Sequence, residues 1–188
     1  MSEKPFNINQ AKSEINKLSF QELESQRENN RGYLPFSIWL HDVRSVFNVG
    51  SVFRSCDGSS AERLYLSGFS PTPPRQDLSK TALGAEETVP YTYLRDFKEI
   101  ISQIKAEGKK IIAMELTDNS IDFSDLKDSD YPAVFLLGNE VGGLPSELLE
   151  MCDSAVSLPM LGKKHSLNVS VTAGIICYKS VEILQKGI

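Results

Sequence analysis

Short apolar runs of strand length recur along this chain and alternate with segments of helical spacing. The runs are 36–40, 63–67, 110–114, 133–137 and 155–158, and the helical segments are 51–56, 94–106 and 168–184. The run 133–137 is apolar at every position, which is typical of a parallel strand covered by helices on both faces. The alternation therefore predicts an α/β domain with a mostly parallel sheet flanked by helices.

Two regions fall outside this alternation. Residues 8–30 are polar with apolar residues at near-helical spacing, and Ser19 with Glu22 is typical of a helix start. Gly32 and Pro35 then interrupt the pattern, so we expect an N-terminal helical arm over residues 1–35 and a core domain over residues 36–188. Residues 68–90 predict a long irregular connection, with a short helix over 79–84 that is closed by glycine.

The composition limits the class of protein. A chain of 188 residues with 40% hydrophobic content can bury a full core. The sequence contains no apolar run of about 18 residues that could span a bilayer, and its first residues lack the apolar stretch of a secretory signal. We therefore expect a cytoplasmic protein with no membrane partner. The three cysteines are far apart and lack the spacing of metal ligands, which predicts reduced, mostly buried thiols and no metal site.

The net charge of −5 argues against a broad nucleic-acid surface, because proteins that bind many phosphates carry a surplus of Lys and Arg. Any contact with RNA should therefore be local. The basic candidates for it are Arg44, Arg54, Lys80, Lys163 and Lys164. Each of them, taken alone, equally fits a solvated surface charge.

Three polar stretches follow apolar runs, at the ends of the expected strands after Leu40, Leu137 and Leu158. In open α/β sheets, ligands bind at the carboxyl ends of the strands, so we expect the three stretches to converge there. The stretch 138–143 is rich in glycine and lets main-chain groups face an adenine or a ribose, although glycines that only turn the chain remain an alternative. Neither GxxxxGK[ST] nor GxGxxG after the first strand is present.

Individual polar side chains in these stretches are candidates for chemistry. Arg54 lies six residues after Asn48, on a helix that Asn48 is expected to cap, and fits either a phosphate clamp or a structural ion pair. Glu140 could order Asn48 or Arg54, or be a solvated loop carboxylate. Ser166 and Asn168 are possible caps of the last helix.

Four motifs, in this order, resemble the SpoU, or TrmH-type, branch of the SPOUT methyltransferases over about residues 37–184. They are Asn48-Val49-Gly50 with Arg54, Leu137-Gly138-Asn139-Glu140 through Gly143-Leu144, Leu158-Pro159-Met160, and Ser166-Leu167-Asn168-Val169-Ser170. The resemblance implies S-adenosylmethionine-dependent methylation of a ribose 2′-hydroxyl in transfer or ribosomal RNA. It also implies a homodimer and a deep C-terminal trefoil knot around the cofactor, an exception to the rule that chains do not knot.

The resemblance also implies roles for single residues. Arg54 takes the central catalytic role of activating the 2′-hydroxyl, and a guanidinium, being always protonated, needs an RNA phosphate or a special environment for it. Asn48, Glu140, Ser166 and Asn168 shape the same centre. The implied cofactor residues are Leu137, Gly138, Asn139, Gly142, Leu158, Met160, Ser166 and Leu167.

The short arm and the acidic charge favour a small structured RNA, so tRNA is the preferred substrate and rRNA the alternative. A non-catalytic, dimeric RNA-binding protein of the same fold is a second hypothesis. A different α/β enzyme that binds ATP or NAD is a third, and the missing phosphate-binding patterns argue against it.

Overall fold

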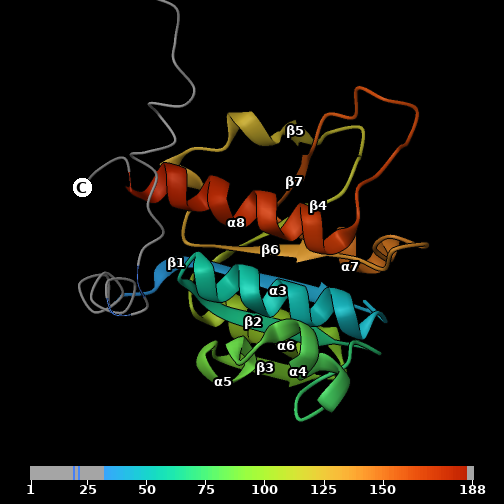
Figure 1. The fold of residues 1–188 in the computed structure, drawn as a ribbon. Coiled ribbons are helices and arrows are strands. Elements are labelled where there is room, and N and C mark those ends of the chain that lie inside the picture. Colours follow the sequence, from blue (N-terminus) through green and yellow to red (C-terminus); the bar gives the residue numbers. More distant parts are fainter. Residues whose placement is uncertain (1–18, 20, 22–31, 186–188) are drawn as a thin grey trace, which may run out of the picture. The chain divides into compact units, whose positions relative to one another are not determined.

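The computed structural model describes residues 19, 21 and 32–185 and contains one seven-stranded sheet within them (Figure 1). The order across the sheet is β3-β2-β1-β6-β4-β7-β5, and every neighbouring pair of strands is parallel. The strands are β1 Leu34–His41, β2 Ala61–Ser67, β3 Tyr91–Leu94, β4 Lys110–Met114, β5 Ile121–Asp122, β6 Ala133–Leu137 and β7 Ser154–Ser157. The expected α/β class with a parallel sheet is confirmed.

Helices cover both faces of the sheet, as the apolar strands require. One face carries α3 Val46–Gly58, α4 Gln76–Ala82, α5 Ala85–Thr88 and α8 Val169–Gln185. The other carries α6 Phe97–Ala106 and α7 Ser146–Leu149, and the short 3-10 turns η1 Phe123–Asp125 and η2 Asp128–Asp130 lie between β5 and β6. Figure 1 shows α3 and α8 side by side in front of the central strands.

Strand β1 shows how the side chains divide between the two faces. Ile38 and Leu40 are buried in the cluster that includes residues of α3 and α8, whereas Trp39 between them is buried in the cluster that includes residues of α6. This division follows from the two-residue period of a strand. Ile38 lies beside Leu64 of β2 and Phe135 of β6 in the parallel register, so the apolar core is continuous across the centre of the sheet.

The edge strands and two helix starts differ from the sequence-based expectation. The edge strands β3 and β5 were not predicted, because they are short and half-exposed and lack a continuous apolar run. The helix expected over 94–106 begins at Phe97, after the cap Asp96, and the helix expected over 51–56 begins five residues earlier, at Val46. Within the connection 68–90, the short helix expected over 79–84 is α4, which begins three residues earlier and is closed by Leu83 in the left-handed conformation rather than by glycine. The helix α5 was not expected.

The expected N-terminal arm falls largely outside the described residues. The helical arm lies outside them, except for residues 19, 21 and 32–35. The chain divides into Met1–Gly32 and Tyr33–Ile188, and the first strand begins at Leu34. Over residues 19, 21 and 32–185, no helix has both the length and the apolar character needed to cross a bilayer.

Candidate functional site

The strand order creates a crevice between β1 and β6. From β1 the chain passes through α3 to β2 on one side, and from β6 it passes through α7 to β7 on the other. Where neighbouring connections diverge in this way, a crevice forms at the carboxyl ends of the strands. An open cavity of about 750 Å³ lies here, lined by Asp42, Arg44, Ser45, Asn139, Glu140, Val141, Gly142, Gly143 and Pro145.

Three polar side chains from distant parts of the sequence are hydrogen-bonded beside this cavity. The amide of Asn48 donates to Glu140 Oε1 at 2.8 Å, and the amide of Asn168 donates to Asn48 Oδ1 at 3.2 Å. The expected convergence of the three motif regions is therefore confirmed, as is the expectation that Glu140 orders Asn48. The contacts orient the Asn48 amide, because its nitrogen faces Glu140 and its oxygen faces Asn168.

Asn139 holds the glycine-rich loop in shape. Its side-chain oxygen accepts hydrogen bonds from the backbone N–H groups of Val141 at 2.9 Å and Gly142 at 3.0 Å. Its side-chain nitrogen donates to the carbonyl of Asp42 at 2.9 Å, which ties the loop after β6 to the loop after β1. Asn139 thus fixes both walls of the cavity.

Gly138 has a steric reason to be glycine. The loop folds back as Asn139 and Gly143 exchange backbone hydrogen bonds, and a Cβ on Gly138 would lie 2.6 Å from the carbonyl carbon of Gly143. Gly143 itself has a φ of +64°, a conformation that glycine adopts without strain. The sequence reasoning missed Glu115, which accepts a hydrogen bond from the Leu144 N–H at 3.3 Å and braces the same loop from the end of β4.

The helix caps at the site differ in part from the expectation. Ser45, and not Asn48, caps α3, and its hydroxyl accepts a hydrogen bond from the Asn48 N–H at 3.3 Å. The Asn48 side chain is thereby free to bind Glu140. Asn168 does cap α8, since its Oδ1 accepts from the Ser170 N–H at 2.8 Å. Ser166 is exposed and has no hydrogen bond to any residue in the described part of the chain.

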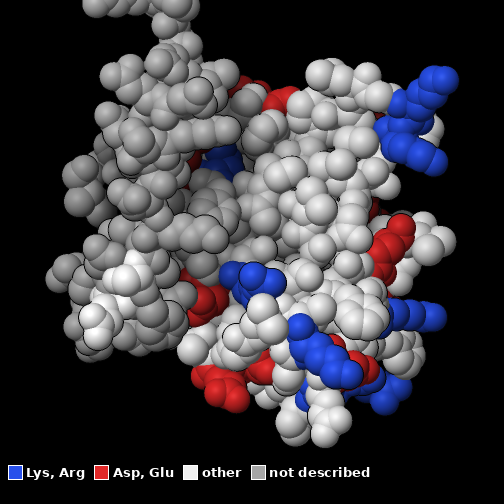
Figure 2. Space-filling model, viewed as in Figure 1, with Lys and Arg blue, Asp and Glu red and all other residues white. Residues whose placement is uncertain are grey.

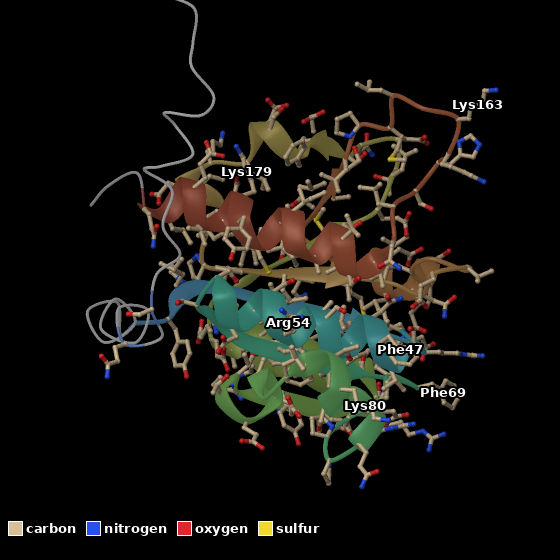
Figure 3. The ribbon with its side chains drawn as sticks, viewed as in Figure 1. Phe47, Arg54, Phe69, Lys80, Lys163 and Lys179 are labelled. Carbon is tan, nitrogen blue, oxygen red and sulfur yellow. The ribbon has the colours of Figure 1, made fainter. Side chains whose placement is uncertain are left out.

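Arg54 lies apart from this network. It is exposed on α3 and makes no hydrogen bond or ion pair with any residue that the structure describes, so a structural ion pair with them is not its role. Figure 3 shows it near the middle of α3, away from Phe47 at the start of the helix. Six residues separate Arg54 from Asn48, or about 9 Å along the helix axis. Within one copy of the chain, no hydrogen bond or ion pair joins Arg54 to the described residues of the Asn48 network.

The residues expected at the cofactor fall into two groups on either side of β4. Leu137, Gly138, Asn139 and Gly142 belong to β6 and its loop, and Leu158, Met160, Ser166 and Leu167 belong to the loop after β7. Strand β4 lies between these two strands, and neither Leu158 nor any residue after it lines the open cavity.

The loops around β4 offer both apolar side chains and main-chain polar groups, which are the groups that S-adenosylmethionine needs. The loops after β4 and β7 expose the large apolar side chains of Leu116, Leu161 and Leu167, which suit an adenine ring or a methionine chain. The glycine-rich loop after β6, the other neighbour of β4, offers main-chain groups for the polar edges.

The basic residues expected at RNA are exposed: Arg44, Lys80, Lys163 and Lys164. Figure 3 places Lys163 on the long loop after β7 and Lys80 on α4, on opposite sides of the start of α3. Figure 2 shows blue groups interspersed with red ones on the face it presents, rather than one continuous basic surface.

A buried polar group under the site was not anticipated. His41 Nδ1 lies 2.7 Å from the Ser67 hydroxyl, which also accepts from the Trp39 indole at 2.8 Å. The other ring nitrogen of His41, Nε2, faces Asp42 Oδ2 at 3.7 Å. Burial lowers the pKa of His41, against the opposing effect of Asp42. Asp42 has a φ of 55°, a conformation that Asp tolerates better than most residues. An Asp directly after a strand is the feature of the sequence that could have indicated this arrangement.

Comparisons with known proteins bear on this site. Residues 35–178 match the model of the SpoU rRNA Methylase family. The tRNA (guanosine(18)-2'-O)-methyltransferase of Escherichia coli (strain K12) is 27% identical over 77% of this chain, and the 23S rRNA (guanosine-2'-O-)-methyltransferase RlmB of Neisseria meningitidis serogroup B is 31% identical over 76%. The chain spans 62% and 56% of the lengths of these two proteins.

A solved structure shows the same fold. The AdoMet-bound rRNA methyltransferase from Sinorhizobium meliloti superposes with a TM-score of 0.73 and 26% identity, covering 78% of this chain and 56% of that one.

Proposed function

Because the chain belongs to the SpoU rRNA Methylase family, we propose that it methylates a ribose 2′-hydroxyl of RNA with S-adenosylmethionine, with tRNA as the preferred substrate and rRNA as the alternative. The observation that supports this proposal most strongly is the hydrogen-bonded set Asn48, Glu140 and Asn168 beside the cavity between β1 and β6. Relatives named as tRNA and rRNA 2′-O-methyltransferases support the reaction, and the AdoMet-bound neighbour supports the cofactor.

The proposed reaction is a single displacement. When bound, S-adenosylmethionine supplies a methyl carbon that its sulfonium already activates. The ribose 2′-oxygen bonds to that carbon as the carbon–sulfur bond breaks, and the electron pair of that bond stays on sulfur as a neutral thioether. The hydroxyl proton must leave to a base, whereas the leaving group needs no acid.

The chain's own residues align and activate the ribose in this proposal. The amide of Asn48 is held between Glu140 and Asn168, so it can offer a polar group in a fixed orientation beside the cavity. Arg54 activates the 2′-hydroxyl, with an RNA phosphate as the acceptor of the proton. The exposed guanidinium of Arg54, without a partner in the described part of the chain, is available to such a phosphate.

A homodimer is part of the proposal. The face formed by α3 and α8 exposes Arg54 together with an apolar stripe on α8 that includes Val171 and Tyr178. A second copy that covers this stripe would bring Arg54 to a subunit boundary, where it could serve the partner's ribose. The trefoil knot stays a prediction. So do the assignment of residues 36–188 as the methyltransferase domain, a role for residues 1–35 in choosing the RNA, and a cytoplasmic location beside that RNA.

Methyl transfer to ribose can be tested directly. Purified protein is incubated with radiolabelled S-adenosylmethionine and bulk RNA, and the RNA is then hydrolysed in alkali. A 2′-O-methyl group blocks cleavage of the next phosphodiester, so we expect the label in alkali-resistant dinucleotides. Label confined to bases would contradict the ribose assignment, and a protein that binds RNA without any transfer would be the non-catalytic alternative.

Arg54→Ala tests the proposed role of the guanidinium. We expect turnover to fall by about a hundredfold or more, as for removal of a group that acts on the reacting proton. Binding of S-adenosylmethionine, measured by calorimetry, should be unchanged, because Arg54 lies away from the loops of β6 and β7. Lys105→Ala is the matched control, because it changes an exposed basic residue on α6, on the other face of the sheet, and it should retain turnover. Loss of cofactor binding in Arg54→Ala would assign Arg54 a structural role instead.

A further inference from the structure

Phe69 is an apolar side chain that the fold leaves in solvent. It lies on the turn after β2, at the carboxyl edge of the sheet, and 63% of it is exposed. Figure 3 shows the ring projecting away from the ribbon, near Phe47. The guanidinium carbons of Arg44 and Arg95 each lie 5.6 Å from the centre of the ring. An exposed ring with two cations close to it is therefore present beside the candidate site.

The turn that carries Phe69 is firmly held. The Phe69 N–H donates to Asp42 Oδ1 at 2.7 Å. The Ser70 hydroxyl donates to the Leu40 carbonyl at 3.2 Å and accepts from the Val43 N–H at 3.1 Å. Gly68 has a φ of +63°, and any Cβ there would overlap the Asp42 carboxylate. The exposure of Phe69 is thus built into the fold, although burial of the ring would be more favourable for stability alone.

The two arginines keep their charge available. Neither Arg44 nor Arg95 makes an ion pair with a residue in the described part of the chain. The nearby carboxylates are engaged by backbone groups, since Asp42 binds the Phe69 N–H and Asp96 accepts from the Lys98 N–H. A ligand with negative charge and a flat apolar face would satisfy both the cations and the ring.

The same side chains adjoin the cavity of the proposed reaction. Asp42 and Arg44 line that cavity, and Asp42 holds the Phe69 turn. A chain of nucleotides with its target ribose in the cavity would therefore pass over Phe69 within a short distance. At 5.6 Å from the ring centre the guanidiniums are not in tight stacking contact with the ring, and 63% of Phe69 is exposed, so ring surface is available to a base.

We propose that Phe69, Arg44 and Arg95 form a binding site for an unpaired RNA nucleotide next to the target nucleotide. This inference rests on the proposed function for the identity of the nucleic acid. The base stacks on the Phe69 ring, and the guanidiniums of Arg44 and Arg95 bind the flanking phosphates. Stacking on a ring tolerates every base but needs an exposed base face, so the site selects a single-stranded segment rather than a sequence.

Binding of a short oligouridylate that carries one 2-aminopurine tests the proposal without any need for turnover. We expect Phe69→Ala and Phe69→Leu to weaken binding by about tenfold, because neither side chain offers a ring for stacking. Phe69→Trp should bind at least as tightly as the wild type and should quench the 2-aminopurine fluorescence that Phe69→Leu leaves unquenched. Phe69→Leu is the matched control, since it keeps an apolar side chain of similar size.

Salt dependence separates the two kinds of contact. For single strands, each neutralised phosphate contributes about 0.7 to the slope of log affinity against log salt. Arg44→Ala and Arg95→Ala should each lower the slope by about that amount, whereas Phe69→Leu should leave it unchanged. A duplex of the same length should bind equally weakly to the wild type and to Phe69→Leu.

The outcomes distinguish this inference from the proposed function. Oligonucleotide affinities of Phe69→Ala and Phe69→Leu equal to that of the wild type would overturn the inference, even if ribose methylation is found, and would be expected if this surface served a protein. Binding that depends on the ring of Phe69 would support it even if no methyl transfer is detected, in which case only the proposed function fails.

Discussion

At Gly138 the backbone of the glycine-rich loop returns so closely that no side chain fits. A Cβ there would meet the backbone of Gly143 and Leu144, which cannot move away as a flexible side chain could. The neighbouring Asn139 then holds the loop against the end of β1. The single residue that allows the fold-back thus supports the whole wall of the cavity.

Gly138→Ala should therefore destabilise the protein by about 2 kcal/mol, the typical cost of an overpacked position. Urea unfolding followed by circular dichroism measures this difference. Gly162→Ala is the matched control, because a Cβ at Gly162 meets no atom within 4 Å and the backbone there has no positive φ, so its stability should not change. Equal stability of the two variants would show that the loop relaxes without cost.

At the scale of elements, α6 shows why helix boundaries were harder to predict than helix positions. Leu94 and Phe97 both pack against the same apolar cluster, although Leu94 ends strand β3 and Phe97 begins α6. The apolar spacing therefore continues across a strand, a cap and a helix, and periodicity alone could not separate them. The cap Asp96, whose side chain accepts a hydrogen bond from the Lys98 N–H at 2.9 Å, marks the true start of the helix.

Asp96→Ala should lower the free energy of unfolding by about 1 kcal/mol, because a backbone donor in the first turn of α6 loses its partner. Asp96→Asn keeps an acceptor at the same position and should retain most of the stability. Both variants should be compared by thermal unfolding. A loss in Asp96→Asn as large as that in Asp96→Ala would mean that the carboxylate charge, and not the cap, stabilises α6.

At the scale of the whole molecule, the face formed by α3 and α8 exposes apolar side chains that a single copy of the chain does not cover. Val171 and Tyr178 are seven residues apart and so lie on the same side of α8, with 49% and 58% of their surfaces exposed. Gly174 between them lies close to Ser55 of α3, so the stripe adjoins the helix that carries Arg54. An apolar stripe of this kind is typical of a helix that packs against a partner.

The proposed homodimer predicts that Val171→Asp with Tyr178→Asp shifts the protein from dimer to monomer, because buried carboxylates without partners oppose association. Sedimentation equilibrium at micromolar concentration measures the shift. Phe69→Asp changes an equally exposed aromatic residue away from α8, and this control should remain a dimer. A wild-type protein that sediments as a monomer would exclude the dimer, and with it the idea that Arg54 serves the partner's site.

The sequence by itself determined the class of fold, because burial on both faces makes a central strand apolar at every position: the run 133–137 coincides with β6. The sequence also determined the motifs of the site, because glycines and polar residues that directly follow an apolar strand can be recognised from their immediate neighbours along the chain. Only the tertiary structure decided which motifs meet. The strand order brings Asn48 to Glu140 and Asn168, which are 92 and 120 residues away along the chain. Hydrophobic periodicity depends on the neighbours of a residue along the chain. The contacts of Asn48, the cap of α3 and the exposure of Phe69 depend instead on how the elements pack across the sheet.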